Sequence, residues 1–203
     1  KEKARQGVKI QIIIDSLGCL FKNNKDIKEE LEAVGIELYK FNPFSPILSG
    51  YINYRDHRKI VVIDGKYGYT GGVNIADEYV NLVSKFGHWK DVGIKIEGEA
   101  VWSFAIMFLR NLETITNKNI EYNWYKRKLK SEKNNQGYVL PLADGPDNRK
   151  LPIENTYIQT INYAKDYVYM TTPYFIISEQ LLTAILNSAR AGVDVRLIVP
   201  HIP

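Results

Sequence analysis

Two side chains, His57 and Lys59, are the residues of this sequence best suited to chemistry on an anionic group. On a β-strand alternate side chains share a face, so an extended segment here would point the imidazole and the ammonium group the same way. An imidazole nitrogen can attack the phosphorus of a phosphodiester and form a phosphohistidine, while a lysine stabilises the charge on the phosphoryl oxygens. The pair therefore predicts a nucleophile and its electrostatic partner.

Four further residues extend this pattern. Asp64 completes H-x-K-x4-D, and Gly71, Gly72 and Asn74 follow it. Asp64 has the opposite strand parity to His57 and begins an Asp-Gly turn signal, so its side chain is predicted to pair or cap at the strand end. The amide of Asn74 is predicted to be a second donor to the phosphate, and the glycines would let the backbone approach it closely.

The segment from Asn53 to Tyr79, NYRDHRKIVVIDGKYGYTGGVNIADEY, resembles the first active-site motif of the phospholipase D superfamily. Within that superfamily, the amino-acid sequence of this segment most resembles that of the bacterial cardiolipin synthases. Later segments are similar to the same family in the same order: Trp89-Lys90-Asp91, Gly145-Pro146-Asp147 and Thr172-Pro173-Tyr174-Phe175. The resemblance covers nearly the whole chain and implies an α/β fold, a phospholipase D-like mixed sheet flanked by helices.

The same resemblance implies how the site works. His57, Lys59 and Asp64 would form one catalytic half-site, and a histidine in a second motif would protonate the leaving alkoxide. Family members hold the nucleophilic imidazole with an acidic residue further along the chain, for which Asp91 is the first candidate and Glu78 the second. No metal or other cofactor is expected, because no carboxylate cluster or His/Cys set is evident and the lysine charge can replace a metal.

A short stretch of the sequence occurs twice. Residues 4–14, ARQGVKIQIII, match residues 189–199, ARAGVDVRLIV, at five of eleven positions, among them Ala4, Arg5, Gly7 and Val8, and agree in class at most others. In the second copy Ser178 can cap a helix, Gly192 can end it, and a strand is predicted over 193–199. A helix over 155–165 and a strand over 167–172 precede it, so a βαβ unit with parallel pairing is expected.

The duplication divides the chain. Residues 1–124 are predicted to form a first phospholipase D-like unit whose upstream strand is missing, 125–137 a basic linker, and 138–203 the start of a second unit that stops before its own motif. Within the first unit we expect a strand over 59–63, a hairpin partner over 66–70 and a helix over 99–112.

Composition sets outer limits on partners and location. A net charge of +4 gives no strong case for nucleic-acid binding, and the single Cys19 excludes an intramolecular disulfide. No apolar run is long enough to cross a bilayer, so this piece is expected to be soluble. The resemblance places the full-length protein in the bacterial cell membrane, with its catalytic domain on the cytoplasmic side.

The predicted activity is transfer of a phosphatidyl group between two phosphatidylglycerols, with release of glycerol. Anionic phospholipid is therefore the expected partner, and the chain alone is expected to be inactive unless a homodimer completes the site. Phe44, Ile47 and Leu48 belong either to the core or to a lipid-access loop. The linker lysines, near Trp124 and Tyr125, are either solvated or in contact with lipid headgroups.

Two alternatives remain at this stage. Water instead of an alcohol as acceptor would make the protein a phospholipase D-type hydrolase, or a nuclease of the same superfamily. The other alternative is a non-catalytic module that binds anionic headgroups.

Overall fold

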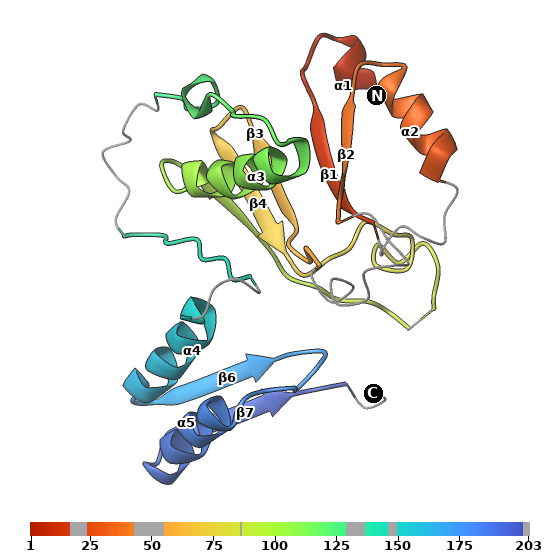
Figure 1. Ribbon diagram of the computed structural model, residues 1–203. Coiled ribbons are helices and arrows are strands. Elements are labelled where there is room, and N and C mark those ends of the chain that lie inside the picture. Colours follow the sequence, from red (N-terminus) through yellow and green to blue (C-terminus); the bar gives the residue numbers. More distant parts are fainter. Residues whose placement is uncertain (17–23, 43–54, 86, 129–136, 146–149, 201–203) are drawn as a thin grey trace, which may run out of the picture. The chain divides into compact units, whose positions relative to one another are not determined.

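The structure is a computed structural model that describes residues 1–16, 24–42, 55–85, 87–128, 137–145 and 150–200. It contains two compact units, Lys1–Pro141 and Leu142–Pro203 (Figure 1). The predicted α/β class is confirmed. Cys19, the stretch containing Phe44, Ile47 and Leu48, and most of the predicted linker lie outside the described residues.

The first unit contains a parallel and an antiparallel sheet. The parallel pair is β1 (Gln11–Asp15) and β2 (Glu37–Phe41), and the antiparallel sheet has the order β3-β4-β5. Its remaining elements are α1 (Glu2–Arg5), α2 (Asn24–Glu32), β3 (Ile60–Ile63), β4 (Tyr67–Gly71), β5 (Gly93–Glu97), α3 (Val101–Thr116) and the short 3-10 helix η2 (Tyr122–Trp124).

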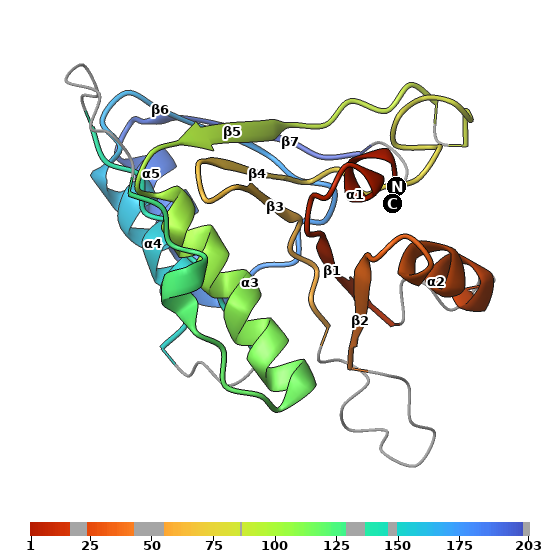
Figure 2. The same cartoon turned by 90° about the horizontal axis from the view of Figure 1, so that it is seen from above.

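Helix α3 supplies most of the buried apolar side chains of the first unit. It packs against β2, β3 and β4, and Figure 2 shows it running alongside the antiparallel sheet. The buried positions recur at helical spacing: Val101, Phe104, Ala105, Leu109 and Leu112. The sheet can approach this face because Gly68 has no side chain, and a Cβ there would lie 3.1 Å from the Phe104 ring. The predicted helix over 99–112 is thus found, one turn longer at its C-terminal end.

The β3–β4 hairpin is found where the sequence predicts it. Asp64 and Gly65 both have positive φ, 53° and 63°, as the two central residues of a type I′ turn require. The strand begins at Ile60, so Lys59 lies one residue before it. Strand β5 was not predicted, because its sequence, GIKIE, gives only a short apolar alternation.

The second unit has the order α4 (Pro152–Tyr163), β6 (Tyr167–Thr171), α5 (Glu179–Arg190) and β7 (Asp194–Ile198). Strands β6 and β7 pair in parallel, as predicted. Both helices pack through Ile161, Ala184 and Ile185, and the predicted Ser178 cap is confirmed because its hydroxyl accepts the Leu181 N–H at 3.1 Å.

The duplicated stretch ends its helix in the same way in both units. Gly7 and Gly192 end their helices with φ of 88° and 93°. The N–H of Gly7 donates to Ala4 O at 2.9 Å, and that of Gly192 donates to Ala189 O at 3.0 Å. The local joint is therefore repeated, while the wider division into pseudo-symmetric halves stays a prediction.

The two joint glycines generate a stability prediction. Nothing lies within 4 Å of a Cβ built on Gly192, so the cost of Gly192→Ala is backbone strain alone, about 1–2 kcal/mol. Gly192→Asn should lose less, because asparagine tolerates left-handed backbone better than alanine. Urea unfolding measures both variants, and equal losses would contradict a purely conformational cause.

Candidate active site

The segment 55–59, which leads into β3, carries the predicted reactive pair. His57 is exposed, and within the described part of the chain its imidazole has no hydrogen-bond partner. Lys59 is half-buried and its Nζ donates to the backbone oxygen of His57 at 2.8 Å. The structure therefore brings the ammonium group beside residue 57, although both residues precede the strand on which the parity argument placed them.

The environment of Lys59 suits its ammonium group to binding an anion. Burial lowers the pKa of Lys59, and the negative charges of Asp56 and Asp91 oppose that shift. Its hydrogen bond to His57 uses one of three N–H donors, so two remain for other acceptors. A partly desolvated ammonium interacts more strongly with a phosphate than a fully hydrated one does.

Two carboxylates hold the backbone on either side of His57. Asp15 Oδ2, at the end of β1, accepts the N–H of Asp56 at 3.0 Å. Asp56 Oδ1 accepts the N–H of Arg58 at 3.1 Å, and the Arg58 guanidinium makes two bonds of 2.8 Å to the same carboxylate. Asn111 Nδ2 on α3 donates to Asp56 Oδ2 at 2.5 Å.

These four side chains, Asp15, Asp56, Arg58 and Asn111, were not among the predicted site residues. Asp15 could have been predicted from the sequence, because it ends an apolar strand. Strand ends of parallel sheets often hold functional side chains. Asp56 and Arg58 flank the histidine but match no chemical motif, and Asn111 has no sequence signal at all because it lies 55 residues from Asp56.

The glycine pair has a packing role that the sequence did not predict. A Cβ on Gly71 would lie 2.5 Å from Val92 O, and one on Gly72 would lie 2.5 Å from Asp91 Oδ1. The missing side chains therefore let the lead-in to β5 pass directly beside the end of β4. Their predicted contact with a phosphate stays a prediction.

Asp91 is held in place by its own loop. Its Oδ2 accepts the Trp89 indole N–H at 3.1 Å and its Oδ1 accepts the Val92 N–H at 2.7 Å. The Asn81 side chain bonds both the N–H and the O of Trp89, at 2.6 and 2.9 Å, and the Tyr79 ring meets the Trp89 ring edge-on. The structure thus places Asp91 near Lys59, with no described hydrogen bond to His57, and its orienting role stays a prediction.

The other predicted site residues are less constrained. Asp64 is exposed at the hairpin turn, at the opposite end of β3 from Lys59, and makes no hydrogen bond or ion pair within the described residues. The expected pairing or capping by the Asp64 carboxylate is therefore not found among the described residues. The turn needs positive φ at Asp64 and no contact of its side chain. Asn74 and Glu78 are half-buried, and neither has a recorded partner in that part of the chain.

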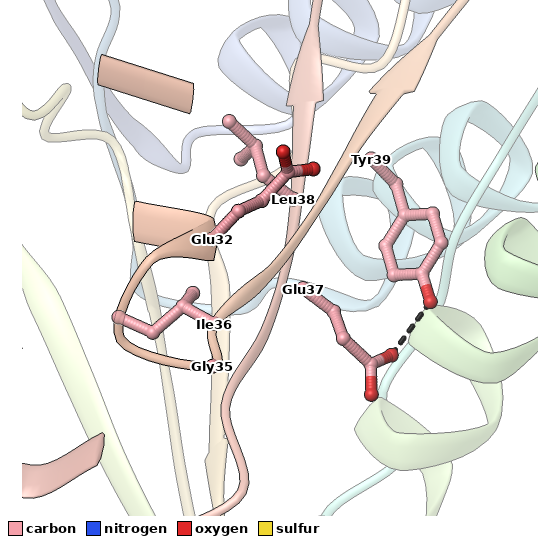
Figure 3. Close-up of a pocket in the computed structure, with 6 residues that line it drawn as sticks. All are labelled: Glu32, Gly35, Ile36, Glu37, Leu38 and Tyr39. Atoms are coloured by element: carbon pink, nitrogen blue, oxygen red, sulfur yellow. Dashed lines mark hydrogen bonds between the residues drawn. The ribbon is translucent and has the colours of Figure 1, made fainter. Parts of the chain in front are cut away.

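Two open pockets in the described part of the chain include neither residue of this pair. One of about 320 Å³ is lined by Glu32, Gly35, Ile36, Glu37, Leu38 and Tyr39 (Figure 3). In it Tyr39 donates to Glu37 at 2.6 Å, and this bond with burial raises the pKa of Tyr39 to about 12. Another, of about 340 Å³, belongs to the second unit. Neither pocket contains His57 or Lys59, so neither is taken as the site.

Two further properties concern metals and membranes. Among the described residues no three His, Cys, Asp or Glu side chains cluster as a metal site would require. None of the helices in the same ranges combines the length and apolar character that a bilayer crossing needs.

Comparison with known proteins assigns the family. Residues 1–89 and 157–202 match the family described as "Cardiolipin synthase, PLD-like domain". A cardiolipin synthase of Geobacillus kaustophilus is 40% identical over 100% of this chain and 40% of its own length. Cardiolipin synthase 2 of Bacillus cereus is 39% identical over 100% of this chain and 39% of its own length. An uncharacterized protein of Streptococcus mutans is 42% identical over 100% of this chain and 44% of its own length.

The fold and the H-x-K site define a phospholipase D-like domain. The chain belongs to the cardiolipin synthase family of such domains, as the resemblance predicted. It spans about two fifths of the length of these relatives. The first matched segment contains every predicted site residue except Asp91, which lies two positions after its end.

The packing at the glycine pair predicts an order of stabilities. Gly71→Ala should destabilise more than Gly72→Ala, because the first methyl group meets backbone and the second meets a side chain. Overpacking of this kind costs about 1–3 kcal/mol. Gly93→Ala is the matched control, since its Cβ would have no contact closer than 3.7 Å.

A double variant tests the cause. In an Asp91→Ala background, Gly72→Ala should cost little, because the carboxylate that the methyl group meets is gone. Urea unfolding of the four proteins gives the interaction free energy. An unchanged cost in the double variant would contradict the proposed contact.

The Asp56 carboxylate predicts a pH dependence. Burial alone would raise its pKa, but hydrogen bonds from Arg58 and Asn111 and the charge of Arg58 hold the pKa below its ordinary value. Because the pKa of Asp56 is lower in the folded state than in the unfolded state, about 3.9, its ionised form stabilises the fold at pH values above that unfolded pKa. This stabilisation is lost as the pH falls through the folded-state pKa. The stability difference between wild type and Asp56→Asn should therefore be largest near neutral pH and shrink below about pH 4. A difference that stays constant across this range in urea unfolding would contradict the shift.

Proposed function

We propose that this chain carries one half of the active site of a phosphatidyltransferase of the cardiolipin synthase type. The observation that carries the proposal is an exposed His57 whose backbone oxygen accepts a hydrogen bond from the half-buried ammonium group of Lys59, on a chain of this family. The relatives named cardiolipin synthase support the reaction class. Phosphatidylglycerol is the proposed substrate, and an anionic membrane surface is the proposed partner of the complete protein.

The proposed reaction has two steps. A histidine nitrogen, from His57 or from the second half-site, attacks the phosphorus of one phosphatidylglycerol, and the bond from phosphorus to the terminal glycerol oxygen breaks. The facing histidine protonates that oxygen, and glycerol leaves. A hydroxyl of a second phosphatidylglycerol then attacks the phosphorus of the phosphohistidine and gives up its proton to the same facing histidine. The bond from phosphorus to the histidine nitrogen breaks, and cardiolipin leaves.

Lys59 has the electrostatic role in this scheme. The phosphoryl oxygens gain charge as the nucleophile adds, and preorganised donors lower the barrier where that charge develops. The two N–H groups of Lys59 not bonded to His57 can serve as such donors. The Asn74 amide is the proposed second donor, and Asp91 the proposed acceptor for the other imidazole nitrogen.

The proposal requires a second histidine and lysine pair. That pair comes either from another part of the complete protein or from a second copy of this chain. The expectation that the 203-residue chain alone has little or no turnover is part of the same proposal.

His57→Asn in the complete protein tests the proposed role. Turnover of labelled phosphatidylglycerol should fall about 10³-fold, in the range for loss of a catalytic acid, base or nucleophile. His88→Asn is the matched control, because His88 is also exposed but lies outside the H-x-K segment. Equal turnover in wild type and His57→Asn would overturn the assignment of His57.

The products separate the alternatives in the same assay. Cardiolipin with glycerol supports the transferase, whereas phosphatidic acid without cardiolipin indicates hydrolysis. Cleavage of single-stranded DNA indicates a nuclease. Headgroup binding without any turnover by the wild-type protein indicates a non-catalytic module.

A further inference from the structure

The residues on both sides of His57 have backbone N–H groups that donate to carboxylates. The N–H of Asp56, immediately before the histidine, donates to Asp15 at 3.0 Å. The N–H of Arg58, immediately after it, donates to Asp56 at 3.1 Å. His57 therefore lies between two residues whose backbone N–H groups are held by carboxylates, while no described side chain bonds the ring itself.

These bonds connect the segment to two separate elements of the first unit. Asp15 is the last residue of β1, and Asn111 lies in the C-terminal half of α3. Asn111 donates to one oxygen of Asp56 at 2.5 Å, and Arg58 bonds both oxygens of that carboxylate. The histidine is thus placed relative to both the parallel sheet and the helix that packs on the hairpin.

Burial of the Asp15 and Asp56 carboxylates restricts the histidine segment to one position. The Asp15 and Asp56 side chains are only 16% and 15% exposed. A carboxylate withdrawn from water is costly unless donors surround it, so a shift of the segment that broke these bonds would leave charge uncompensated. Arg55, which lies 3.5 Å from Asp15 and donates to Asn42 O at 3.1 Å, adds a further attachment.

We propose that Asp15, Asp56 and Asn111, called here the histidine clamp, are positioning residues for His57. The effect of the clamp on catalysis rests on the proposed function. In that reaction the His57 imidazole must be held in line with the phosphorus and the leaving oxygen. A misplacement of about 1 Å can cost about 10²-fold in rate. The clamp acts through the backbone of the segment and makes no contact with the reacting atoms.

Asn111→Leu in the complete protein tests the clamp. Leucine has a similar volume but cannot donate to Asp56. We expect kcat for phosphatidyl transfer to fall about 10- to 100-fold with little change in KM, because substrate binding is retained and the nucleophile is displaced. Amide hydrogen exchange at Asp56 and Arg58 should become faster. Asn111→Ser is a second variant should the leucine prevent folding.

Glu113→Gln is the matched control on the same helix. Glu113 accepts the Tyr122 O–H at 2.5 Å and the Ile120 N–H at 3.1 Å, so it holds the chain that follows α3 and not the histidine segment. This variant should lose comparable stability while kcat and the exchange at Asp56 and Arg58 stay unchanged. If kcat falls in both variants in proportion to the loss of stability, the clamp is merely structural and the proposal is overturned.

The readouts separate this inference from the proposed function. A wild-type protein without phosphatidyl transfer would reject the proposed function, and the exchange measurement would still judge the clamp. Exchange at Asp56 and Arg58 that stays at wild-type rates in Asn111→Leu would overturn the clamp whatever the activity. Faster exchange with unchanged kcat would overturn its positioning role.

Discussion

A carboxylate that folding withdraws from water must find hydrogen-bond donors, and Asp15 and Asp56 find theirs in the peptide groups around His57. The rest of the first unit is arranged around this requirement. Strand β1 has to end at Asp15, and α3 has to present Asn111 to Asp56. The His57 ring stays exposed because the backbone N–H groups of its neighbours Asp56 and Arg58, and not the ring, make these bonds.

The packing around Asp91 depends on the absence of side chains at two positions. Gly71 and Gly72 leave space for Val92 O and the Asp91 carboxylate, each 2.5 Å from where a Cβ would stand. The Asp91 charge thereby comes within electrostatic reach of Lys59, whose pKa burial lowers. The glycine pair thus leaves room for one of the two carboxylates whose charge acts on Lys59.

Local sequence signals predicted local structure well. The Asp64-Gly65 turn, the Ser178 cap and the helix-ending Gly192 are found where their residue types place them. The reason is that each depends on neighbours only a few positions away. Strand β5 was missed because its position depends on pairing with β4, which its own five residues do not encode clearly.

By itself, the sequence determined the family and the helix–strand joints and predicted the His57 and Lys59 pair, since these follow from residue type and short-range spacing. Tertiary structure decided which groups hold that pair. Asp15 and Asn111 lie 41 and 55 residues from Asp56 and carry no shared pattern, so only folding brings them to it. It also decided that Asp64 lies at the far end of the hairpin from His57, because the strand between them is extended.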